Sequence, residues 1–220
     1  MSDTESFIDE VTEEVRRDQL FGYIKRYGWI AALAVVGLVG GAAWNEYSKA
    51  RSNAAAQLKG DAIYAALASD DSAERVAALS SLPMSPVVSL LLAAEQQQSG
   101  DAAAAAVTLD ALAADAASQQ LYREIAQFKS VLVQSEVLTA DARIAALEPL
   151  AQPGRPFRLL ALEQIAVAEL EAGDKDAAIA TLQQIAEDAG VTQGLRGRVT
   201  GLMVALGEDP EVIVPAETAQ

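Results

Sequence analysis

The side chains best suited to binding a charged partner are arginines in two short segments. Arg155 and Arg158 flank Phe157, while Arg196 and Arg198 flank a glycine, and the surrounding region is acidic. A guanidinium group can hold a carboxylate through two parallel hydrogen bonds, so either segment could receive a carboxylate or an acidic peptide. The alternative is that these arginines are ordinary solvated surface residues.

Residues that usually perform catalysis or bind metals are scarce. The chain contains neither histidine nor cysteine, which removes the commonest metal ligand, the usual general base and thiol chemistry. It has no Gly-x-Ser-x-Gly elbow, phosphate loop or calcium loop. Its carboxylates lie on alanine-rich segments, where acidic residues normally solvate a helix. We therefore expect no enzyme, no metal, no cofactor and no small-molecule substrate.

The charge balance bears on the class of partner. The formal net charge is −15, and most of it comes from residues after Arg51. Nucleic acid binding requires clustered lysine and arginine that neutralise phosphates, so we expect no nucleic acid partner.

The segment from Tyr27 to Trp44 carries no charge and follows the basic pair Lys25 and Arg26. A helix of this length measures about 27 Å, close to the hydrocarbon thickness of a bilayer. Aromatic residues stand near both ends, as is typical of a membrane–water interface. The sequence predicts a transmembrane helix over 27–47; the alternative is a buried core helix, which the internal glycines disfavour.

The flanking charges indicate the orientation of this helix. Lys25 and Arg26 lie closest to it, which favours a cytoplasmic N-terminus and a periplasmic C-terminal domain at the inner membrane. A cleaved signal peptide is the alternative, with Gly41 to Ala43 as a cleavage site. Because the preceding segment is long and acidic, an uncleaved anchor is favoured.

The remainder of the chain predicts an all-α fold. Alanine is abundant and apolar residues recur at helical spacing. Turn signals interrupt this pattern, because glycine favours a helix end and aspartate the start of the next helix. The predicted breaks are Ser69 to Asp71, Leu82 to Pro86, Ser99 to Asp101, Thr139 to Asp141, Gln152 to Pro156, Gly173 to Asp174 and Gly207 to Pro210.

The breaks recur at intervals of 30 to 40 residues, which is typical of stacked helical hairpins and close to the tetratricopeptide period of 34. The clearest unit runs from Arg158 to Gly190, with Ala166 and Ala178 where its two helices must approach closely. The unit around Gly100 repeats this with Ala93 and Ala105. We expect four parts: a cytoplasmic segment 1–26, a transmembrane helix 27–47, a tetratricopeptide-like domain 48–207 and a flexible tail 208–220.

The layout resembles the bacterial single-span proteins with a tetratricopeptide-like exported domain, the group of the ancillary SecYEG translocon subunit. The resemblance covers essentially the whole chain. It is carried by Phe7 to Asp18, by Lys25 to Gly28 before the span, by Ala168 to Asp174 and by the closing helix near Leu195 to Leu206. It implies binding to the Sec translocon and to periplasmic chaperones.

Two features near the N-terminus suggest further contacts. Phe7, Ile8, Val11 and Val15 would share one side of a short amphipathic helix that docks on a partner. The alternative is that this segment is a loosely ordered tail. In the span, Gly37 and Gly41 form a Gly-xxx-Gly pair that would let another membrane helix pack closely. Glycine is also common in membrane helices without such a role.

A stack of hairpins presents a concave face lined by the first helix of each repeat. The pattern places five polar residues near that face: Gln97, Gln98, Gln134, Glu163 and Glu171. With Arg155 and Arg158 they are the candidate partner-binding residues; the alternative is plain solvated helix surface.

Three functions are compatible with the sequence. The first is a membrane-anchored scaffold that binds other proteins, with translocon-associated chaperoning as its most specific form. The second is an envelope adaptor for division or wall-synthesis machinery. The third is a structural subunit of a larger membrane complex, held mainly through its span.

Overall fold

A computed structural model describes the backbone of residues 3–208, and the side chains of these residues except 3–24, 27, 31 and 32. Over this part the chain is all-helical, as predicted, and contains no strand. It divides into two compact units, Met1–Asp61 and Ala62–Gln220.

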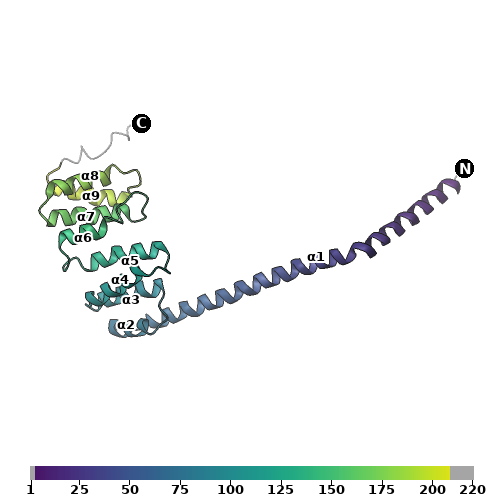
Figure 1. The fold of residues 1–220 in the computed structure, drawn as a ribbon, viewed down its shortest axis with the longest axis horizontal. Helices are drawn as coiled ribbons and strands as arrows, with labels where there is room; N and C mark the ends of the chain where they lie inside the picture. Colours follow the sequence, from purple (N-terminus) through teal and green to yellow (C-terminus); the bar gives the residue numbers. More distant parts are fainter. Residues whose placement is uncertain (1–2, 209–220) are drawn as a thin grey trace. The chain divides into compact units, whose positions relative to one another are not determined.

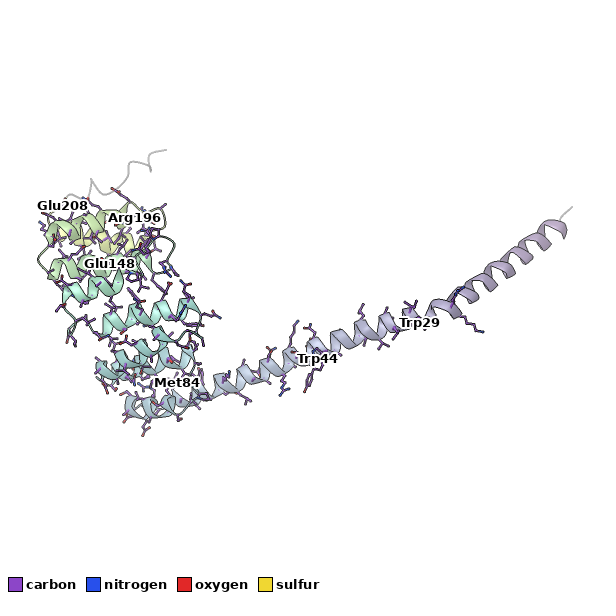
Figure 2. The ribbon with its side chains drawn as sticks, in the orientation of Figure 1. Trp29, Trp44, Met84, Glu148, Arg196 and Glu208 are labelled. Atoms are coloured by element: carbon purple, nitrogen blue, oxygen red, sulfur yellow. The ribbon has the colours of Figure 1, made fainter. Side chains whose placement is uncertain are left out.

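The first unit consists of most of one long helix, α1 (Asp3–Ala66). Within α1 the stretch Gly28–Ala66 is long and apolar enough to cross a membrane by length and composition, and none of its most apolar 18-residue window is buried. The rings of Trp44 and Tyr47 lie 6.4 Å apart, and the Trp29 indole donates to the Arg26 carbonyl at 3.1 Å. Figure 2 shows Trp29 and Trp44 on this helix.

The second unit contains the last turn of α1 and eight shorter helices of the described chain. They are α2 (Ser72–Ser80), α3 (Pro86–Gln98), α4 (Ala102–Ala114), α5 (Gln120–Val133), α6 (Ala140–Leu147), α7 (Arg158–Glu171), α8 (Lys175–Ala186) and α9 (Gln193–Ala205). Most of them pack chiefly on their neighbours in the sequence, and α2 to α7 follow one another in chain order, whereas α9 packs on both α7 and α8 (Figure 1). Contacts between sequence neighbours bury the core.

The predicted breaks are confirmed at the starts of the helices that follow them. Asp71, Asp101 and Asp174 each cap the next helix, accepting a backbone N–H two or three residues ahead. Ser85 and Thr139 do the same for α3 and α6. Each such cap contributes about 1 kcal/mol, because it satisfies a donor that the helix leaves unpaired.

Three boundaries differ from the sequence prediction. Helix α1 does not end near residue 47, because the segment 48–60 is rich in good helix formers, and the compact helical unit begins at Ala62 rather than at residue 48. A break after Asp115 separates α4 from α5, although it contains neither glycine nor proline. Helix α8 ends at Ala186, whereas the sequence predicts a helix from Lys175 to Ala189. The predicted tail 208–220 lies, beyond Glu208, outside the described residues.

The four alanines expected between the paired helices are buried in the core. Ala166, Ala178 and Ala105 are fully buried, and Ala93 is 3% exposed. Ala93 and Ala105 belong to one cluster with Leu109, and α3 packs directly on α4 there. An alanine at these positions lets the two helix backbones come close, so a larger side chain would force them apart.

The hairpins α3–α4 and α7–α8 share one design, displaced by 73 positions. Gly100 and Gly173 both adopt positive φ, at 86° and 85°, and the residue after each donates to the carbonyl five residues earlier. In the first hairpin the Thr108 hydroxyl donates to Gln96 at 2.8 Å, and in the second the Thr181 hydroxyl donates to Glu169 at 2.9 Å. The same turn and the same cross-hairpin bond therefore occur twice.

Candidate partner-binding surfaces

Five arginines of the helical unit form ion pairs with carboxylates of other elements. The pairs are Arg75–Glu95, Arg143–Glu171, Arg155–Glu124, Arg158–Asp188 and Arg198–Glu163. Each links two segments that are 20 to 35 residues apart in sequence. These arginines therefore contribute first to holding neighbouring helices together.

The best-formed pair joins α9 to α7. Arg198 Nε and Nη2 donate to the two carboxylate oxygens of Glu163 at 2.6 and 2.8 Å. Hydrogen bonding to Glu163, followed by its negative charge, raises the pKa of Arg198 above its ordinary value. The Glu163 side chain is 9% exposed, so its carboxylate faces the adjoining helix rather than open solvent.

Arg155 lies in the loop before α7 and reaches back to α5. Its Nη1 donates to Glu124 Oε1 at 2.6 Å, and Gln120 donates to the same oxygen at 2.7 Å. Glu124 is buried, whereas the Arg155 side chain is 39% exposed. The other Glu124 oxygen, Oε2, is buried without a hydrogen-bond partner within the described chain.

A cavity of about 520 Å³ opens beside the start of α7. Arg155 and Arg158 both line it, with Asp188 and Leu195. Because Arg158 pairs with Asp188, the charges at its edge largely neutralise one another. This cavity brings two of the candidate residues together in a single pocket.

The other candidate residues lie apart from it. Gln98 accepts a hydrogen bond from Arg75 at 3.3 Å, and Glu171 at the end of α7 accepts hydrogen bonds from Arg143. Gln134 follows α5 and donates to the Ser130 hydroxyl at 2.7 Å. Gln97 is exposed and lines a smaller cavity of about 110 Å³ with Lys129 and Leu132. The seven residues thus form no single site, and their role in binding another protein stays a prediction.

A second large cavity, of about 460 Å³, was not predicted from the sequence. It lies between the start of α3 and the last turns of α4, and we call it the α3–α4 pocket. Ten residues line it: Met84, Ser85, Pro86, Ser89, Val107, Thr108, Ala111, Leu112, Asp115 and Ser118. Met84, labelled in Figure 2, is 59% exposed and Val107 is 70% exposed. The signals in the sequence are a methionine in the break before α3 and a valine at an outward position of α4.

Metal binding has no support in the geometry of the described residues, where no group of three or more aspartate and glutamate side chains is placed to hold an ion. Comparison of the chain with protein-family models, curated proteins and solved structures finds no match.

The α3–α4 pocket and the cavity beside α7 share three equivalent lining positions of the two related hairpins, Ser85 and Arg158, Pro86 and Leu159, and Asp115 and Asp188. Asp115 and Asp188 are 73 positions apart, and the Oδ1 of each accepts the N–H two residues ahead, at 3.0 and 2.8 Å. The position equivalent to Arg158 is Ser85, which caps α3 instead of forming an ion pair. The first pocket therefore keeps an aspartate without the arginine that neutralises the second.

In α1, Gly37 and Gly41 lie one helical turn apart, and a Cβ added to either would have no neighbour within 4 Å. Val36 and Leu38 beside them are 66% and 76% exposed. Close packing of a second membrane helix at this pair stays a prediction.

Proposed function

We propose that the chain is a single-pass protein of the cell inner membrane whose helical unit, Ala62–Gln220, binds other proteins. The N-terminus is cytoplasmic and the helical unit periplasmic. Sec translocon components and periplasmic chaperones are the partners suggested by the family resemblance. The proposal rests on one observation: the same chain contains an apolar helix that is not buried and a unit of repeated helical hairpins.

The anchoring part rests on α1. Exposed residues of the stretch Gly28–Trp44 include Leu33, Val35 and Val39, each about 60% accessible. Burying one such side chain in an apolar surrounding stabilises by about 1.5–3 kcal/mol, so this helix is far more stable in lipid than in water. The basic pair before it supports a cytoplasmic N-terminus.

The binding part rests on the architecture of the second unit, which we interpret as a tetratricopeptide-like stack. Sequential helix pairing, two hairpins with the same glycine turn, and alanines at the closest approach all support this interpretation. Stacks of this type offer an extended surface built from many repeats, and they commonly serve as binding modules. Anchoring such a module raises the local concentration of its partners, so weak contacts suffice.

The anchor and its orientation are tested together. Carbonate washing of membranes should leave the full-length protein in the pellet, with an intact mass of 23.0 kDa. A reporter that is active only in the periplasm, fused after Gln220, should be active. A lower mass, corresponding to a chain that begins near Ala43, would show that a signal peptide is cleaved and would overturn the anchor.

The binding function is tested by affinity purification from mild detergent. Enrichment of translocon and chaperone components with the native chain supports the proposal. Exchange of Gly28–Trp44 for an unrelated span separates the roles of anchor and helical unit. If this exchange abolishes every association while removal of Ser72–Ala205 does not, the chain is a structural subunit held through its span. Recovery of wall-synthesis enzymes alone would instead identify an envelope adaptor.

A further inference from the structure

The α3–α4 pocket is apolar on one side and acidic at its edge. We propose that it binds an extended segment of a partner protein that presents one large apolar side chain next to a lysine or arginine. This inference rests on the proposed binding function and names the partner's chemistry.

The apolar side is formed by residues from two elements. Met84 precedes α3, and Val107 and Ala111 lie one turn apart on the outer face of α4. Covering side chains as exposed as Met84 and Val107 removes apolar surface from water, which is favourable. Methionine is flexible and adapts to differently shaped partners. A cavity of about 460 Å³ is large enough for a leucine, methionine or phenylalanine side chain.

The charge at the edge selects the residue beside that side chain. Asp115 is the sole charged residue among those that line the pocket, and no arginine or lysine of the described chain forms an ion pair with it. The positive charge of Arg123 on α5 acts on Asp115 without forming an ion pair with it. Asp115 is exposed, and each of its oxygens keeps a lone pair beyond the bonds from Ala117 and Ser118. A lysine or arginine of the partner would therefore meet an exposed carboxylate that has no ion-pair partner among the described residues.

The related hairpin provides an internal contrast. At the cavity beside α7, Arg158 already pairs with Asp188, and the α8 residue that matches Val107 is Ala180, which does not line that cavity. The two cavities share a backbone design but differ in charge and in apolar surface. Of these two cavities, the α3–α4 pocket has the two features that a basic and apolar segment requires.

The test uses the full-length chain in detergent and three fluorescent ten-residue peptides of glycine and serine. Their central pairs are leucine–lysine, leucine–glutamate and serine–lysine, and fluorescence anisotropy reports binding. We expect the leucine–lysine peptide to bind at least about tenfold more tightly than either of the others. Equal binding of all three peptides would overturn the proposal.

Two variants locate the site. Val107→Glu should reduce binding of the leucine–lysine peptide at least about tenfold, whereas Ala180→Glu at the matched position of α8 should leave it unchanged. Both positions are exposed, so circular dichroism should show the same helix content and melting temperature for both variants. Equal loss in the two variants, or no loss in Val107→Glu, would contradict the assignment.

A third variant tests the charge. Asp115→Asn should make the leucine–lysine and leucine–glutamate peptides bind alike; a preserved preference for lysine would contradict the role of Asp115.

Sedimentation of the wild type and Val107→Glu tests a second copy as the occupant: a dimer that only the wild type forms would overturn the proposal. If Val107→Glu loses the peptide but co-purifies with every partner of the wild type, the pocket assignment fails while the scaffold function stands.

Discussion

Arg198 and Glu163, 35 residues apart, meet through two parallel hydrogen bonds that tie the last described helix to α7. Glu163 is buried and Arg198 is half-exposed. Removing the arginine alone therefore leaves a carboxylate in the interface between helices without its donors, which is more harmful than removing both groups.

The first prediction follows from this asymmetry. Arg198→Leu should lower the melting temperature, and the double variant Arg198→Leu with Glu163→Leu should recover more than half of that loss. Thermal unfolding followed by circular dichroism measures both. Additive losses would show that the two side chains act independently. Arg196→Leu is the matched control, because Arg196 is exposed on the same helix and forms no ion pair within the described chain.

The second prediction concerns the turn between α7 and α8. Gly173 has φ of 85°, a conformation in which an L side chain is strained. Gly173→Ala should destabilise the helical unit by about 1–2 kcal/mol. Gly201→Ala should instead stabilise it by about 0.5–1 kcal/mol, because Gly201 lies within α9 and an added Cβ meets no neighbour. Denaturant titration measures both changes, and the same sign for the two variants would contradict this account.

The third prediction concerns pH. The Ser118 hydroxyl, at 2.6 Å, and then the Ala117 N–H lower the pKa of Asp115 below its ordinary value of 3.8. A group whose pKa is lower in the folded chain stabilises the fold above its unfolded pKa, and this contribution is lost as pH falls through the folded pKa. Ser118→Ala should therefore raise the pKa of Asp115 and shift that loss to higher pH. Carboxyl-carbon NMR titration measures the pKa; Ser80→Ala on α2 is the control that should not change it.

Much of the helical order could be predicted from the sequence, because local chemistry sets most of the boundaries. Aspartate caps and glycines such as Gly100 and Gly173 act within a few residues, so their pattern survives without tertiary information. The break after Asp115 was missed because a side-chain turn, Asp115 to Ala117 and Ser118, replaces the usual glycine or proline.

The candidate site could be predicted far less well. Residue types identified Arg155 and Arg158 as potential ligands for an acidic partner, but their own partners, Glu124 and Asp188, lie about 30 residues away. Pairing over that distance depends on how successive hairpins pack, which the helical period does not specify. The α3–α4 pocket was missed because its two walls come from separate segments of one hairpin, and their packing is not specified by the helical period either.

The fourth prediction concerns the membrane helix. If Gly37 and Gly41 form a packing face, a branched side chain at either position should keep a second helix away, because small residues allow the close approach of backbones. Gly41→Ile should reduce association of the span at least about tenfold in a reporter of transmembrane helix interaction. Ala43→Ile lies about 200° around the helix from Gly41, since each residue turns it by about 100°, and should leave association unchanged. Equal signals from the native span and the Gly41→Ile span would show that this glycine pair is not a packing face. Any partner of the span would then contact another face of the helix.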